Sequence, residues 1–174
     1  MLSLKNAPRN SGDPMKKPAV KPAEATAVTH VSDVTLRKLM GYHMKRAFNV
    51  VQTDLVQTLK PFDLRMLTYT ALVLIVDNPG MRQSQLADGM DIERPNLVVI
   101  IDELERRELI IRERVPTDRR AYALKATLAG RQLYEKAVAA VTKHEALLLD
   151  GIDDATRATV IAALKQIEKS PRKG

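Results

Sequence analysis

The sequence is poor in the residue types that carry much of protein chemistry. Its 174 residues contain no cysteine, no tryptophan, two phenylalanines and three histidines. The absence of cysteine excludes disulfide bonds, cysteine-ligated zinc, thiol nucleophiles and cysteine-based redox sensing. The spacing of His30, His43 and His144 fits no metal-binding motif, so we expect neither a metal nor another cofactor. So few aromatic rings also disfavour a platform on which bases stack.

Long apolar runs are also missing. The longest, at 71–76, has six residues, whereas a membrane-spanning helix needs about 20. The N-terminus lacks the apolar segment of a signal peptide. We therefore expect a cytoplasmic protein that does not interact with membranes.

The sequence offers no catalytic constellation. Most of its five serines lie near the termini, no Ser-His-Asp grouping is visible, and no glycine-rich phosphate loop is present. We predict that the protein is not an enzyme. Its charge indicates a different role: 28 basic residues against 21 acidic ones give a net charge of +7, which suits an anionic partner such as nucleic acid.

The first 32 residues differ from the rest of the chain. They contain four of the nine prolines and no apolar period, so we predict a disordered basic tail at 1–32. This tail is either an arm that adds nonspecific DNA affinity or a solvated leader. We predict a folded domain at 33–170 and a short C-terminal tail at 171–174.

Apolar residues spaced three or four apart predict a long helix at 36–60 that ends at Pro61. A second, almost wholly apolar helix follows, with Asp63 as its N-cap. A short helix at 83–88, a turn at Gly89 and a helix at 94–107 come next, and Pro95 fits only in the first turn of the latter.

The C-terminal part begins with two β-prone segments, at 109–112 and 121–126, which predict a hairpin around a turn at 116–118. Thr127 is expected to cap a long helix, and Asp153 or Asp154 a final one. The fold class is therefore mainly α. It is a winged helix-turn-helix with a two-stranded β wing and long N- and C-terminal helices.

In such a unit the second helix of the helix-turn-helix, here at 94–107, lies in the major groove. Its exposed first residues would be Glu93, Arg94 and Asn96. Arginine can bond guanine and asparagine can bond adenine, each with two hydrogen bonds. The hairpin region at 112–131 is basic, with two acids and six cations. The cations are Arg112, Arg114, Arg119, Arg120, Lys125 and Arg131. By contrast, Arg106 and Arg107 among three glutamates are typical of a solvated helix face with i,i+4 pairs.

Four segments together resemble the MarR family of bacterial transcription regulators. They are RQSQLA at 82–87, IDELERRELI at 101–110, PTDRR at 116–120 and TLAG at 127–130. The resemblance covers about 36–169. It implies a homodimer with dimerisation helices at 33–60 and 127–169 and a winged helix-turn-helix at 63–126. It also implies that the protein binds a palindromic DNA operator.

The resemblance assigns roles to the wing. Arg120 would enter the minor groove, braced by Asp118, although Asp118 could equally cap the turn. The full set of predicted DNA-contacting residues is Arg82, Gln83, Ser84, Arg94, Asn96, Arg112, Arg114, Asp118, Arg119 and Arg120. The chain departs from the family pattern at three places: Arg82 replaces a serine or threonine, Pro95-Asn96 replaces a Ser-Thr pair, and Glu108 replaces a glycine.

Many regulators of this family release DNA when a small aromatic acid or its thioester binds. Candidate effector residues are His43 and Arg46 on the first helix and Met66 and Tyr69 on the second. Each has a structural alternative, as a packed or a surface residue. The resemblance therefore implies a repressor that its effector releases from the operator. Its alternatives are a ligand-independent activator or counter-silencer, and a helical dimerisation module that uses the winged helix for protein contacts.

Overall fold

The computed structural model describes the backbone of residues 31–115 and 118–170, with the side chains of these residues other than 115 and 118–121. Most of the predicted tail at 1–32 and all of 171–174 therefore lie outside the described residues. Residues 31–38 belong to a separate unit. There Arg37 in the short 3-10 helix η1 (Leu36–Lys38) forms an ion pair with Asp33, with a nitrogen–oxygen distance of 2.8 Å.

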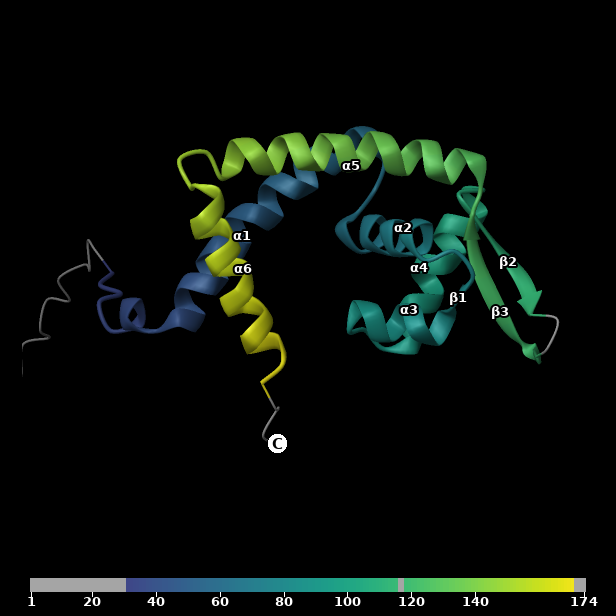
Figure 1. Ribbon diagram of the computed structural model, residues 1–174, viewed down its shortest axis with the longest axis horizontal. Coiled ribbons are helices and arrows are strands. Elements are labelled where there is room, and N and C mark those ends of the chain that lie inside the picture. The colour runs from purple at the N-terminus through teal and green to yellow at the C-terminus, as the bar shows by residue number, and fades with distance from the viewer. Residues whose placement is uncertain (1–30, 116–117, 171–174) are drawn as a thin grey trace, which may run out of the picture. The chain divides into compact units, whose positions relative to one another are not determined.

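The second unit, residues 39–174, is mainly helical (Figure 1). Its helices are α1 (Met40–Leu59), the 3-10 helix η2 (Lys60–Phe62), α2 (Met66–Asp77), α3 (Gln83–Met90), α4 (Arg94–Arg106), α5 (Leu128–Leu148) and α6 (Asp154–Glu168). Helix α5 runs along α2, and its first residues adjoin the wing. None of the described helices is both long and apolar enough to cross a membrane.

The sheet is antiparallel and has the strand order β1-β3-β2. Its strands are β1 (Met81–Arg82), β2 (Ile110–Val115) and β3 (Asp118–Ala126). The mainly α winged-helix fold is confirmed, but the sheet has three strands where a two-stranded wing was predicted. The additional strand pairs Met81 with Leu124. Two residues are too short to produce a periodic signal in the sequence.

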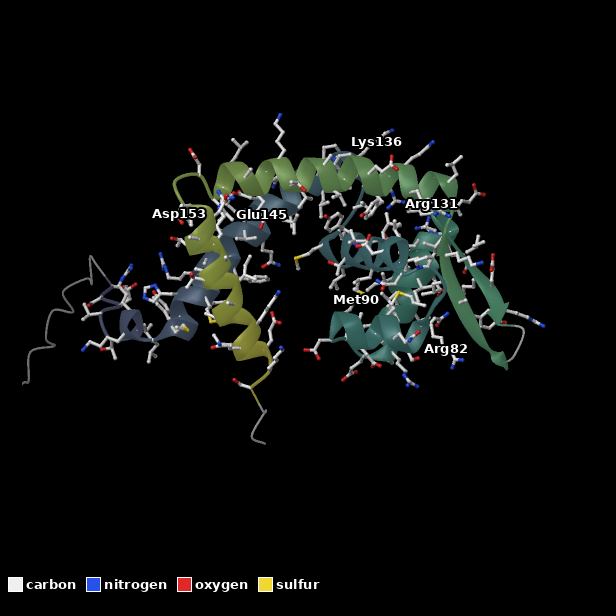
Figure 2. The ribbon with its side chains drawn as sticks, in the orientation of Figure 1. Arg82, Met90, Arg131, Lys136, Glu145 and Asp153 are labelled. Carbon is white, nitrogen blue, oxygen red and sulfur yellow. The ribbon has the colours of Figure 1, made fainter. Side chains whose placement is uncertain are left out.

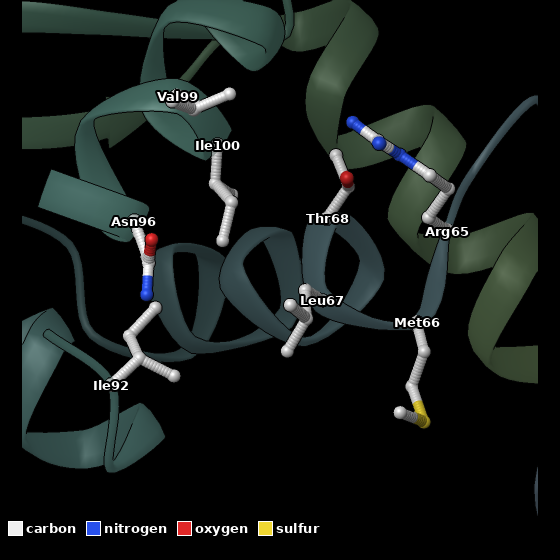
Figure 3. A pocket seen from close by; sticks show the side chains of 8 residues that line it. All are labelled: Arg65, Met66, Leu67, Thr68, Ile92, Asn96, Val99 and Ile100. Carbon is white, nitrogen blue, oxygen red and sulfur yellow. The ribbon is translucent and has the colours of Figure 1, made fainter.

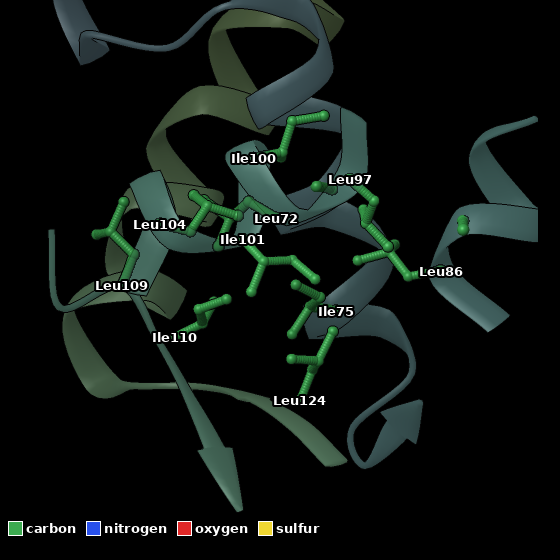
Figure 4. Close-up of a cluster of buried hydrophobic side chains, with 12 residues drawn as sticks. Leu72, Ile75, Leu86, Leu97, Ile100, Ile101, Leu104, Leu109, Ile110 and Leu124 are labelled. Atoms are coloured by element: carbon green, nitrogen blue, oxygen red, sulfur yellow. The ribbon is translucent and has the colours of Figure 1, made fainter. Parts of the chain in front are cut away.

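The main core lies between α2, α3, α4 and the base of the wing (Figure 4). Its fully buried side chains include Leu72, Ile75, Leu86, Ile101 and Leu124. This core fixes the orientation of α4 against α2, because close-packed side chains leave little freedom for one helix to shift. A second cluster of Leu59, Leu64 and Ala137 joins the end of α1 to α5.

Three predicted helix starts are confirmed. The Thr127 hydroxyl accepts a hydrogen bond from the Gly130 N–H at 3.0 Å. An oxygen of Asp153 accepts one from the Thr156 N–H at 2.8 Å, and this contact lowers the pKa of the Asp153 carboxyl. Pro95 lies in the first turn of α4, where no backbone donor is missed.

Several predicted boundaries are wrong. Helix α1 begins at Met40, after the separate 3-10 turn at 36–38. Asp63 does not cap α2: it has a left-handed backbone (φ 51°) that ends η2, and Arg65 is the N-cap. Gly89 is inside α3, and the chain turns at Asp91 (φ 49°). Both aspartates end a helix in the left-handed conformation, which a short polar side chain tolerates.

Both strands of the wing are longer than predicted. The residues that extend them are mostly charged, so apolar alternation could not reveal them. Pairing between the two strands, rather than burial, keeps this part of the wing extended.

Candidate nucleic-acid interface

Helices α3 and α4 form a helix-turn-helix around the left-handed Asp91. The Ile92 N–H donates to the Ala87 carbonyl at 3.1 Å and closes the turn. Leu86 on α3 and Leu97 and Ile101 on α4 are buried in the main core. This packing leaves the N-terminal end of α4 on the surface, where Arg94, Pro95 and Asn96 are all exposed.

The start of α4 exposes one cation, Arg94, directly after an exposed acid, Glu93. Its N-cap, Glu93, makes no side-chain hydrogen bond to the helix. Pro95 has no N–H, and the Asn96 and Leu97 N–H groups donate to the Glu93 carbonyl at 3.1 and 3.2 Å. The exposed groups at this end are therefore the Arg94 guanidinium and the Asn96 side chain. Arg94 can bind a phosphate or a base, and the exposed amide of Asn96 adds a donor and an acceptor that can bond a base edge.

The predicted contacts at the start of α3 lie beside the wing. Arg82 pairs with Ala123 in the sheet and is exposed (Figure 2). Its backbone N–H donates to the Gln85 side chain at 2.8 Å, so α3 is capped although a serine or threonine is absent. Gln83 and Ser84 follow in the first turn and are half-buried.

The wing carries two described arginines in different situations. Arg112 is half-buried, and its guanidinium forms ion pairs with Asp102 and, at 3.3 Å, with Glu105 on α4. Arg114 is exposed, with no ion pair among the described residues. Lys125 is paired with Glu113 across the strands at 2.6 Å. Arg112 therefore ties the wing to α4, and Arg114 is available to a partner.

Asp118, Arg119 and Arg120 begin β3. Their side chains are outside the described part of the structure, so the bracing of Arg120 by Asp118 stays a prediction. Val115 pairs with Asp118, and the register shifts between Arg114 and Val115. The backbone thus places the three residues at the outer end of the wing.

The four effector candidates lie in three different surroundings. His43 and Arg46 are exposed on α1 and line a hollow together with Ala47, Asn49 and Val50. Tyr69 packs against the cluster that joins α1 to α5, and burial raises the pKa of its phenol. Met66 lines two other hollows, one of them together with Val56 of α1.

The other hollow lined by Met66 is a pocket of about 430 Å³ between α2 and α4 (Figure 3). Arg65 and Thr68 lie at one end, and Asn96 and Ile92 at the other. The Thr68 hydroxyl is buried and has no hydrogen-bond partner in the described residues. This pocket could not be predicted from the sequence, because its walls come from helices about 30 residues apart in the chain.

Two comparisons decide the family. The family model described as MarR family matches residues 64–122. A putative transcriptional regulatory protein for the hcr operon of Thauera aromatica is 32% identical over 154 residues, which are 88% of this chain and 92% of that protein. The chain belongs to the MarR family. The matched region runs from just before α2 into β3, so it contains the helix-turn-helix and most of the wing.

Solved structures of MarR-type regulators agree with this assignment. The transcriptional repressor CouR bound to a 23-mer DNA duplex superposes with a TM-score of 0.77 at 33% identity, over 81% of this chain and all of that one. CouR from Rhodococcus jostii RHA1 bound to p-coumaroyl-CoA gives 0.72 at 29% identity, over 80% and 98% of the two chains. This MarR-family protein is a transcription regulator with a DNA-binding winged helix.

Ion pairs and hydrogen bonds that were not predicted hold α4 in place in this MarR-family chain. Glu103 on α4 pairs with Arg65 before α2, and with Arg107 at 4.0 Å. Arg107 also donates to the Phe62 carbonyl at 3.1 Å. The i,i+4 pair of Glu103 and Arg107 was predictable, but partners about 40 residues away were not.

Proposed function

We propose that this protein is a homodimeric transcriptional repressor that binds a palindromic operator. The observation that carries the proposal is the exposed start of α4, with Arg94 and Asn96, in a helix-turn-helix that is followed by a wing. It belongs to a chain similar to a repressor whose structure contains a DNA duplex. One winged helix per subunit would place two α4 helices in successive major grooves of a two-fold symmetric site.

The proposed DNA contacts are nine of the ten predicted residues: Arg82, Gln83, Ser84, Arg94, Asn96, Arg114, Arg119, Arg120 and, as a brace, Asp118. We assign Arg112 a different role. Its guanidinium is engaged by two carboxylates of α4, and a phosphate contact would require it to leave them. We therefore propose that Arg112 sets the angle of the wing relative to α4.

The dimer is supported by apolar side chains that nothing covers in the described chain. Helix α6 buries none of its residues, and Val160, Ile161, Leu164 and Ile167 are all exposed. Helix α1 exposes Met40, Met44, Phe48 and Val51 in the same way. Helices gain most of their stability in proteins from packing an apolar face, so we propose that a second copy covers these two.

The effector we propose is a small aromatic acid or its thioester. A similar repressor has been solved with p-coumaroyl-CoA. His43, Arg46, Met66 and Tyr69 stay the candidates for contact with it. Such a ligand weakens DNA binding if it binds better to a form of the dimer that does not fit the operator.

Fluorescence anisotropy tests the proposal. The full chain is titrated onto the DNA upstream of its own gene and onto a scrambled duplex of equal composition, across a salt series. We expect binding to the native duplex to be about 10³-fold tighter or more. Equal, steeply salt-dependent binding to both duplexes would contradict sequence-specific recognition of that DNA.

The same assay tests the effector. An aromatic acid, its CoA thioester and free CoA are added separately to the formed complex. We expect the acid or the thioester to lower the anisotropy and free CoA to leave it unchanged. Release by free CoA alone would show that the aromatic group is not what the protein recognises.

A further inference from the structure

Two valines on α4, Val98 and Val99, are exposed and do not belong to the buried face of the helix. Leu97, Ile100, Ile101 and Leu104 form the buried face. With about 100° per residue, Val99 lies about 200° from Leu97 and so points away from the core. It is 63% exposed, and Val98 beside it is 45% exposed.

Single exposed apolar residues are common and need no function by themselves. These two valines differ because of their position in the part of α4 that can approach DNA. Residues 94–99 contain one cation and no acid, with the exposed acid Glu93 just before them, whereas the next turns contain Asp102, Glu103 and Glu105. These acids are held in ion pairs with Arg65, Arg107 and Arg112. The N-terminal half of α4 is therefore the half that can approach DNA most closely.

The exposed side chains of that half are of two chemical kinds. Arg94 and Asn96 can form hydrogen bonds, and Val98 and Val99 cannot. Val99 lies one turn from Asn96 and at the edge of the pocket between α2 and α4 (Figure 3). A reading helix with these residues combines hydrogen bonding at its first turn with an apolar surface immediately after it.

In the major groove, thymine is the base that presents a methyl group, while the other bases present donors and acceptors there. A valine packed against a cytosine or adenine amino group would leave that donor without a partner, which is costly. We propose that Val99, with Val98 beside it, reads thymine methyl groups in each half-site of the operator. This inference rests on the proposed function, because it presupposes an operator.

Deoxyuridine scanning isolates the methyl group. The full-length protein first selects its preferred sequence from a random duplex library. Each thymine of that sequence is then replaced by deoxyuridine, which removes the methyl group and keeps every hydrogen bond. We expect one or two thymines per half-site to give about a 4-fold loss of affinity each, the amount for one buried methyl-sized group.

Val99→Ala should bind the thymine and deoxyuridine duplexes equally at the affected position, and Val98→Ala shows whether the second valine has its own thymine. Val56→Ala, which truncates a similarly exposed valine on α1, should keep the wild-type ratio. This ratio does not depend on overall affinity. Because Val99 is exposed, the variant should fold normally, and a thermal melt verifies it.

The outcomes separate the two proposals. A library that returns no enriched sequence would contradict the proposed function itself. An enriched operator on which deoxyuridine has no effect at any thymine would overturn methyl reading and leave sequence-specific binding intact. A deoxyuridine effect that persists in both Val99→Ala and Val98→Ala would assign the methyl contact to another residue and also overturn the inference.

Discussion

At the scale of single residues, Gly130 has the strictest requirement. It lies in the first turn of α5, and a Cβ atom there would be 2.0 Å from the Leu109 carbonyl oxygen. Backbone on both sides of this contact must move to accept any side chain. We expect Gly130→Ala to lower the free energy of unfolding by about 3 kcal/mol.

Urea unfolding measures this loss as a lower midpoint. Gly41→Ala is the control, because Gly41 lies within α1 and has nothing within 4 Å of the added carbon. Alanine is the better helix former there, so the control should gain up to about 1 kcal/mol. Equal effects of the two substitutions would show that the Leu109 contact is not what constrains Gly130.

Glu108 presents the opposite case, a side chain where the backbone favours glycine. Its φ is 56°, a conformation that costs a residue with a Cβ about 1–2 kcal/mol. Glycine removes this strain but increases the entropy of the unfolded chain by a somewhat smaller amount. We therefore expect Glu108→Gly to raise stability by up to about 1 kcal/mol, seen as a higher melting temperature.

Asp91→Gly is the matched comparison, because Asp91 has a similar φ of 49°. Aspartate tolerates this conformation better than glutamate, so the change in stability there should be close to zero. A larger gain at Asp91 than at Glu108 would contradict the argument from backbone strain.

At the scale of elements, Arg112 and Arg114 on β2 separate two roles within the wing. Arg114→Ala should weaken binding to all duplexes and reduce the salt slope by about 1, as expected on loss of a phosphate contact. Arg112→Ala should also weaken binding but leave the salt slope unchanged, because its guanidinium is paired with α4.

Hydrogen exchange supplies the second readout for this pair. Loss of the Arg112 ion pairs should loosen β2 and β3 and accelerate their amide exchange. Arg114→Ala should leave that exchange as in the wild type, because Arg114 has no described ion pair to lose. A salt slope that falls by about 1 in Arg112→Ala would restore Arg112 to the predicted set of DNA contacts.

Some elements of the fold could be predicted from the sequence and others could not. The helices with strong apolar periods, the Thr127 and Asp153 caps and the place of Pro95 could all be predicted, because each depends on neighbours within a turn or two. The start of α2, the turn at Asp91 and the strand β1 could not. They depend on the main core and on pairing with β3, whose residues are distant in the sequence.

The same distinction applies to the candidate site. Arg94 and Asn96 could be chosen from residue type and from their place at the start of a helix, and the structure exposes both. The engagement of Arg112 by α4 and the pocket between α2 and α4 depend on tertiary packing. Val99 was not selected, since a valine in an amphipathic helix suggests core until its exposure is known.

At the scale of the whole molecule, the proposed dimer explains why α1 and α6 are apolar yet exposed. If a second copy covers them, folding and association are coupled, and the melting temperature should rise with protein concentration. Ile161→Glu would place a charge at a covered position of α6, where Ile161 is 52% exposed in the single chain. Burying an unpaired charge costs several kcal/mol, so we expect this variant to sediment as a monomer.

Leu128→Glu is the control for this experiment, because Leu128 is 72% exposed and lies at the start of α5, not on α1 or α6. It should sediment like the wild type. The Ile161→Glu monomer should also bind one half-site weakly and lose the additional affinity of a palindrome, because two linked contacts gain from their effective concentration. Sedimentation of Ile161→Glu as a dimer, with wild-type operator affinity, would show that α6 is not covered by a second copy. The apolar faces of α1 and α6 would then require a different partner.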